Sequence, residues 1–127
     1  MNKNILFLLI YLFPIFAFAQ EYRCPESIDT KQSLSKMYEG WGSMVDTVNG
    51  SHKFEGLTLY DGNPSEAAAL IPNNEGSEKK LFWINDTSKG FWVACFYRQS
   101  KVRLIKEILR TVKKCSLQKG ASNLVCQ

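Results

Sequence analysis

The residue best suited to acid–base chemistry is His52, the only histidine in the chain and the only side chain that ordinarily titrates near neutral pH. A hydrolase would also need an oriented nucleophile or carboxylate, and no known catalytic motif surrounds His52. Asp61 and Glu66 could flank a sugar as paired carboxylates, but a turn explains the first and a helix start the second. We therefore expect His52 to be an exposed strand residue and the chain to have no catalytic residues.

The four cysteines are the other reactive side chains. They contain no Cys-x-x-Cys motif, and one histidine cannot complete the usual zinc ligand set, so we expect no metal and no cofactor. Two disulfides are expected, with three possible pairings. We favour Cys115–Cys126, which could close a final hairpin, and Cys24–Cys95, which would tie the start of the mature chain to a central strand.

The first 19 residues have the pattern of a cleaved signal peptide. Lys3 is followed by an apolar stretch, Ile5 to Phe18, and Ala17-Phe18-Ala19 has the small residues preferred at a cleavage site. The apolar stretch has about 14 residues, fewer than the roughly 20 needed to cross a bilayer. We expect a periplasmic protein in which residues 20–127 form a single disulfide-stabilised, β-rich domain without a membrane span.

Charge is unevenly distributed. The segment from Arg98 to Lys119 contains eight basic residues and one acidic residue, Glu107. Such a segment could bind anionic lipid or glycan at the cell envelope, which is our alternative function. The simpler interpretation is one solvated face of a soluble domain. We expect no nucleic acid partner.

The strand pattern is clearest at Lys89 to Arg98, where alternate residues on both faces are apolar, as in a strand buried on both sides. Asn49-Gly50 separates two extended runs, Trp41 to Val48 and His52 to Tyr60, and predicts a hairpin. Leu81 to Asn85 is predicted to form a second hairpin with the central strand.

Other segments are shorter. Tyr22 to Ile28 is predicted to be an edge strand or arm because it contains Pro25. Gly56 suggests a β-bulge, and Ser65 to Leu70 a helix of one or two turns. Lys101 to Lys114 has the apolar periodicity of an amphipathic helix and a poorer strand alternation. The predicted fold is all-β to α+β: a small antiparallel sheet or sandwich with one short helix and two disulfides.

An ordered set of motifs spans nearly the whole mature chain: Cys24-Pro25, Trp41, Leu57, Tyr60-Asp61-Gly62-x-Pro64, Leu70-x-Pro72, Trp83, Trp92-x-x-Cys95-x-Tyr97 and Cys115. It resembles a family of small exported enterobacterial proteins, first described as hypothetical periplasmic proteins of Salmonella. In that family a strand ending in a Leu-Pro turn follows the Cys-x-Tyr motif. The resemblance therefore implies a strand at about Val102 to Ile108, although Ile108-Leu109 lacks the proline.

Proteins similar to this one are encoded beside type VI secretion effectors that attack peptidoglycan. The resemblance thus implies a periplasmic immunity protein that binds a toxin. It implies no particular oligomeric state. Binding residues concentrate on loops held by a rigid frame, here the Asn49-Gly50 tip and the Asn73 to Lys80 loop. The predicted partner-binding residues are Trp41, Asn49, Gly50, His52, Asn74 and Glu75.

Overall fold

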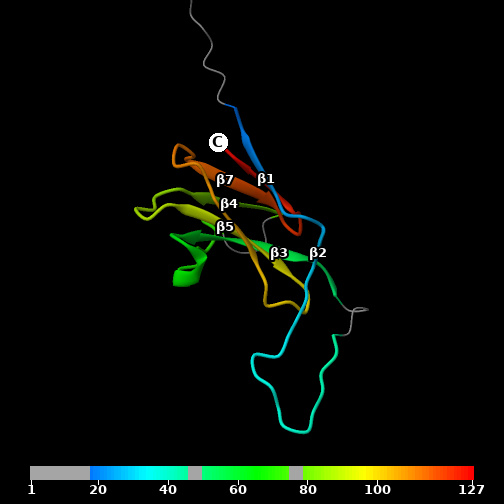
Figure 1. Cartoon of the computed structure of the whole chain (residues 1–127). Coiled ribbons are helices and arrows are strands. Elements are labelled where there is room, and N and C mark those ends of the chain that lie inside the picture. Colours follow the sequence, from blue (N-terminus) through cyan, green and yellow to red (C-terminus); the bar gives the residue numbers. More distant parts are fainter. Residues whose placement is uncertain (1–17, 46–49, 75–78) are drawn as a thin grey trace, which may run out of the picture.

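The computed structural model describes residues 18–45, 50–74 and 79–127. These residues form two four-stranded antiparallel sheets with the strand orders β1-β8-β7-β4 and β2-β3-β5-β6. The two sheets pack against each other, and the long connection from β2 to β3 extends away from both of them (Figure 1). The strands are β1 (Gln20–Arg23), β2 (Ser27–Asp29), β3 (Ser51–Asp61), β4 (Lys80–Ile84), β5 (Phe91–Tyr97), β6 (Leu104–Glu107), β7 (Lys114–Gln118) and β8 (Asn123–Cys126).

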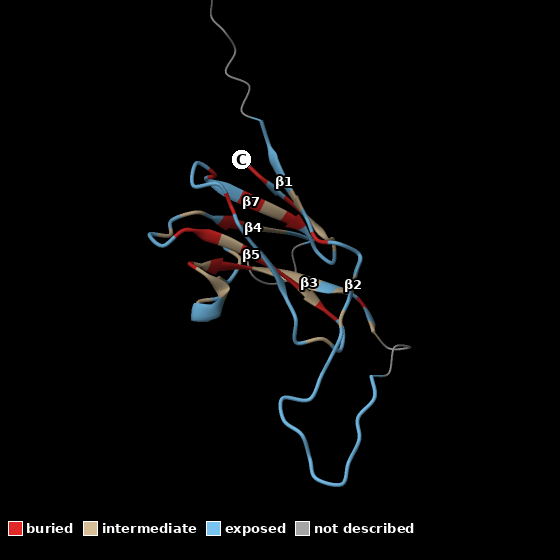
Figure 2. Ribbon diagram, in the orientation of Figure 1, coloured by how far each residue is buried: buried red, intermediate tan, exposed pale blue. Residues whose placement is uncertain are grey.

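The core lies between the sheets, and β5 is an inner strand, as the sequence predicted. Alternate β5 residues, Phe91, Val93, Cys95 and Tyr97, are buried. The other face is only partly covered, because Trp92 and Phe96 are half-buried. Figure 2 shows the buried residues concentrated on the facing strands of the two sheets. The main cluster joins Leu59, Phe91 and Val93 to Trp83, Cys115, Leu117 and Leu124 of the opposite sheet.

Both predicted disulfides are present. Cys24 follows β1 and is bonded to Cys95 in β5, with their Cα atoms 5.9 Å apart. Cys115 and Cys126 occupy directly paired positions on β7 and β8, with a Cα separation of 4.0 Å. The first disulfide fastens the chain where it crosses from the edge of one sheet, β1, to the edge of the other, β2. The second closes the predicted C-terminal hairpin.

The predicted hairpin around Asn49-Gly50 is wrong. Residues 41–45 form no strand, and residues 46–49 lie outside the described ranges. β3 instead pairs with β2 on one edge and with β5 on the other. The backbone N–H of Thr30 bonds to the carbonyl of Gly50 at 2.8 Å, which continues the β2–β3 ladder. The predicted bulge is confirmed, because the β3–β5 register shifts between Phe54 and Gly56.

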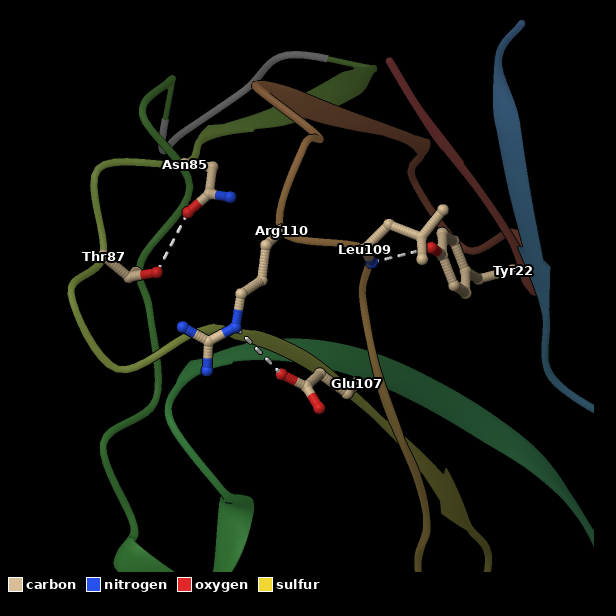
Figure 3. Close-up of polar contacts among 6 residues, drawn as sticks. All are labelled: Tyr22, Asn85, Thr87, Glu107, Leu109 and Arg110. Atoms are coloured by element: carbon tan, nitrogen blue, oxygen red, sulfur yellow. Dashed lines mark hydrogen bonds and ion pairs between the residues drawn. The ribbon is translucent and has the colours of Figure 1, made fainter.

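The second predicted hairpin is also wrong, because β4 pairs with β7 and not with β5. The turn after β4 therefore connects the two sheets. Asn85 makes two hydrogen bonds at this crossing. Its side-chain amide donates to the carbonyl of Val112 at 2.7 Å, and its backbone N–H donates to the carbonyl of Lys113 at 2.8 Å. The same side chain accepts a hydrogen bond from Thr87 (Figure 3). These bonds hold the end of β4 beside the start of β7.

The predicted helix at Ser65 to Leu70 is reduced to one 3-10 turn, Pro64–Glu66. Asn63, not Ser65, caps it, and Ala67 ends it with a φ of 60°. A longer helix cannot form because the following residues return to β3, where the N–H of Leu70 bonds to the carbonyl of Leu59 at 2.8 Å. Tertiary pairing thus outweighs the local helix propensity.

The ambiguous segment from Lys101 to Lys114 contains a strand, as the resemblance implied, and no helix. β6 is shorter than predicted and pairs with β5. Two residues of the helix-like pattern, Ile108 and Val112, lie in the irregular connection after β6 and are buried in the core. The other apolar residues of the pattern are exposed: Val102, Leu104, Ile105 and Leu109. No helix in residues 18–45, 50–74 or 79–127 is long and apolar enough to span a membrane.

The basic segment does not form one solvated face. Arg103 lies over the ring of Phe96, at 4.5 Å from its centroid, on the sheet that contains β5. Lys114 lies over the ring of Phe82, at 4.6 Å, on the sheet that contains β4. Since Phe82 and Phe96 alternate with core residues on their strands, they lie on the outer faces of the two sheets. The positive charge is therefore shared between two faces.

Candidate functional site

His52 is a buried structural residue at the start of β3, and the expectation of an exposed histidine is wrong. Its side chain is 7% exposed. Nδ1 lies 2.8 Å from the carbonyl oxygen of Arg98 and Nε2 lies 2.8 Å from Oγ1 of Thr30. Because a carbonyl oxygen can only accept, Nδ1 carries the proton and Nε2 accepts from the threonine hydroxyl. Both ring nitrogens are thus used to hold the β2–β3 end of the sheet.

Among the described residues, several of the most exposed apolar side chains lie on the connection from β2 to β3. We call residues 30–45 the β2–β3 arm. Met44, Met37 and Trp41 are 87%, 82% and 78% exposed. Three more large apolar side chains of the arm are exposed: Leu34, Tyr38 and Val45. Apolar residues gathered on one exposed segment usually mark a binding surface.

The arm is fixed at its base and turns sharply near its end. At the base, Thr30 is held by Gly50 and His52 through the hydrogen bonds described above. Near the end, the N–H of Trp41 donates to the carbonyl of Tyr38 at 3.1 Å, and Gly40 takes a φ of 78°, a conformation that favours glycine. This turn brings the backbones of Tyr38 and Trp41 together, and both residues are exposed.

A cavity of about 630 Å³ lies between the arm and the adjoining end of the sheet. Its lining includes Leu34 and Met44 from the arm, His52 from β3, and Gln99 from the turn after β5. The cavity is open to solvent and has both polar and apolar walls. The arm and this cavity form one continuous surface, which is the candidate site.

The predicted partner-binding residues divide into three groups. Gly50 and His52 line the cavity, and Trp41 lies on the arm beside it. Asn74 is elsewhere, at the free edge of β4, where its side chain donates to the carbonyl of Lys80 at 2.6 Å and accepts from the N–H of Phe82 at 3.0 Å. Asn49 and Glu75 lie outside the described residues.

The partner-binding residues predicted from the sequence did not include Met37, Tyr38 and Met44. A signal was present, because these side chains and Trp41 are apolar in a segment that shows neither helical nor strand periodicity and contains two glycines, Gly40 and Gly42. Such a pattern is typical of a segment outside regular strands and helices. Which of its side chains are exposed depends on what the rest of the fold leaves uncovered.

In the described part of the chain, no three histidine, cysteine, aspartate or glutamate side chains are grouped to hold a metal ion. All four cysteines are in disulfides. The arrangement offers a surface for contact, held by a cross-linked frame.

Comparison with known protein families identifies the family of this chain. The model of the type VI secretion system Tli immunity protein family matches residues 49–127. The match extends from the residue before Gly50 through β8, over more than half of the chain. The chain belongs to this family. No curated protein and no solved structure gives a significant match.

Membership in the Tli immunity family confirms the link to type VI secretion effectors that the resemblance implied. The partner of a Tli family immunity protein is its cognate effector. The family match covers β3 to β8, whereas β1, β2 and the β2–β3 arm precede the matched residues. The role of the arm therefore has to be argued from its own exposure and contacts.

Proposed function

We propose that this Tli family protein neutralises its cognate effector by binding it through the β2–β3 arm. The observation that carries the proposal is the exposure of Trp41, Met37 and Met44 on a segment anchored to a disulfide-linked frame. Immunity by direct binding needs a stable surface and no catalytic group. The arm supplies such a surface.

The side chains of the arm suit a protein partner. Tryptophan and tyrosine carry much of the binding energy at protein interfaces, and Trp41 and Tyr38 are presented by one turn. Methionine adapts its shape to an irregular surface, which suits Met37 and Met44. Burying an exposed side chain of this size contributes about 2 kcal/mol through the hydrophobic effect. The arm could therefore insert into a cleft of the effector and block access of its substrate.

We place the encounter in the periplasm. Disulfides persist in oxidising compartments, and the frame contains two of them, Cys24–Cys95 and Cys115–Cys126. Residues 1–19 have the predicted signal peptide pattern, of which residues 1–17 lie outside the described ranges. β1 begins at Gln20, so cleavage after Ala19 would leave the whole strand in the mature protein.

A periplasmic setting and the family resemblance support an effector that attacks peptidoglycan. The proposal predicts that the purified mature protein inhibits release of soluble fragments from isolated peptidoglycan by the effector. Cells that lack the protein should lyse when the effector reaches their periplasm. Inhibition of an effector that leaves peptidoglycan intact and degrades phospholipid vesicles would keep the immunity role and refute this substrate.

The contact is tested with Trp41→Ala, measured by calorimetric titration of the mature protein with the purified effector. If Trp41 is an anchor of the interface, loss of about 2 kcal/mol should weaken binding about 30-fold. Ile71→Ala is the matched control, because Ile71 is also an exposed apolar residue but lies outside the arm. Equal affinities for the wild type and Trp41→Ala would contradict binding through the arm.

A further inference from the structure

The edges of β1 and β6 lie beside an opening in the sandwich. In the described parts of the chain, β1 pairs only with β8, and β6 pairs only with β5. A cavity of about 210 Å³ lies between them, lined by Tyr22 and Arg23 on one side and by Leu104 and Lys106 on the other. Val93 and Cys95 of β5 form part of its wall. We call this cavity the edge groove.

Two bonds close the ends of the edge groove. At one end the backbone N–H of Leu109 donates to the hydroxyl of Tyr22 at 3.1 Å, which joins β1 to the segment after β6 (Figure 3). At the other end the Cys24–Cys95 disulfide joins the end of β1 to β5, where Cys95 is paired with Leu104 of β6. The groove is therefore a built feature of the frame with fixed ends.

The free edge of β6 has the backbone groups needed to accept another strand. The N–H of Ile108 bonds to the carbonyl of Phe91, so this directly opposed pair is a hydrogen-bonded one. Hydrogen-bonded and non-bonded pairs alternate in antiparallel sheets. Leu104 and Lys106 therefore bond to β5, whereas Ile105 and Glu107 direct their N–H and C=O groups away from it.

β6 is short and carries Lys106, but it still exposes apolar side chains along its free edge. All four of its residues are exposed, and two of them, Leu104 and Ile105, are large and apolar. Lys106 is the type of residue that commonly prevents unwanted strand pairing. By contrast, side chains cover the outer edge of β4. Asn73 accepts a hydrogen bond from the N–H of Ile84, and Asn74 accepts one from the N–H of Phe82.

The charge around β6 identifies the partner. Between Lys101 and Lys114 there are six basic residues and one acidic residue, Glu107, which is paired with Arg110 at 3.7 Å (Figure 3). A second copy of this chain would bring two such basic edges together, at a cost from like-charge repulsion. An acidic segment would be attracted to the edge.

We propose that an extended acidic segment of a protein partner adds to β6 as a further antiparallel strand, with an apolar side chain in the edge groove. This is recognition by strand addition, in which backbone hydrogen bonds supply affinity and the groove supplies specificity. The inference rests on the proposed function, because the partner is the cognate effector. It adds a second contact to that made by the β2–β3 arm.

Hydrogen exchange tests the strand addition directly. In the complex of labelled mature protein with the effector, exchange of the Ile105 and Glu107 amides should slow by about tenfold or more, because both gain acceptors. The Leu104 and Lys106 amides, already bonded to β5, serve as internal controls. Unchanged exchange at Ile105 and Glu107 in a complex that forms would overturn the inference and leave the proposed function standing. Failure of the complex to form would refute both.

Two variants test the backbone and the charge separately. Ile105→Pro removes an outward N–H and keeps the β5 ladder. It should bind the effector about tenfold more weakly than Ile105→Thr, which also loses the isoleucine side chain but keeps the N–H. Lys106→Glu should weaken binding, whereas Lys80→Glu, on β4, should not. Equal binding by Ile105→Pro and Ile105→Thr would overturn the proposal. A wild-type dimer that Ile105→Pro converts to a monomer would assign the edge to a second copy and overturn it too.

Discussion

The hydroxyl of Tyr97 donates a hydrogen bond to the carbonyl oxygen of Pro25 at 2.9 Å, between residues 72 positions apart in the sequence. Tyr97 is 2% exposed and contacts the edge of the Phe54 ring, with ring centroids 6.2 Å apart. The bond lies one residue from the Cys24–Cys95 disulfide. Together they hold the crossing from β1 to β2 against β5.

Burial raises the pKa of the Tyr97 phenol above its ordinary value of 10.0. In the unfolded chain the phenol ionises at about pH 10, whereas the folded protein keeps the proton to higher pH. The unfolded state therefore binds fewer protons above pH 10, and stability should fall as the pH rises through that range. Urea unfolding measured from pH 8 to pH 11 should show this decline.

Tyr97→Phe provides the comparison. At pH 7 it should lower the free energy of unfolding by about 1 kcal/mol, because the Pro25 carbonyl loses its donor. Its decline above pH 10 should be shallower than that of the wild type, since the buried phenol is gone. Parallel curves for the two proteins would show that another group causes the alkaline sensitivity.

The two disulfides should contribute unequally to stability. Cys24 and Cys95 are 71 positions apart in the sequence, and Cys115 and Cys126 are 11 positions apart. Constraint of the unfolded chain is worth about 4 kcal/mol for the long loop and about 3 kcal/mol for the short one. Replacing Cys24 and Cys95 together by serine should therefore destabilise the protein more than replacing Cys115 and Cys126. Denaturant titration of both double variants checks the order, and the reverse order would refute the loop-length argument.

His52→Ala should lower stability by about 2 kcal/mol, because it removes two hydrogen bonds from a buried position. Thr30→Val removes only the bond to Nε2 and keeps the shape of the side chain, so its cost should be about half. Both are measured by urea unfolding. If His52→Ala left stability unchanged, the structural role assigned to this residue would be wrong.

The N-terminus of the exported protein should be Gln20. Intact mass measurement and N-terminal sequencing of protein recovered from the periplasm should give the 20–127 chain with both disulfides formed. A chain that retained residues 1–19 would contradict cleavage, and free thiols would contradict an oxidising compartment. The reduced form, prepared with a thiol reagent, provides the reference mass.

Part of this fold was readable from local pattern. The alternation of apolar residues predicted β5, and Gly56 marked the bulge where β3 changes register. The four cysteines, in a chain predicted to be exported, indicated both disulfides. Each of these features depends on residues close together in sequence, or on chemistry that few residue types can provide.

The tertiary structure decided which strands are neighbours. An Asn-Gly pair forms a hairpin only if both flanking segments become strands. Here β3 pairs with β2 and β5 instead. Similarly, Asn85 bonds to Val112 and Lys113, which carries β4 to β7. The amphipathic pattern of residues 101–114 favoured a helix. In the fold, β6 instead makes its backbone hydrogen bonds to β5.

The sequence alone determined that this chain forms a cross-linked, β-rich frame, because strand alternation and cysteine chemistry are local properties. Only the tertiary structure showed that His52 is held on both nitrogens and that Met37, Trp41 and Met44 project from the β2–β3 arm. The physical reason is that exposure depends on what the rest of the chain leaves uncovered. That is a property of strand pairing across the whole fold, which no single segment encodes.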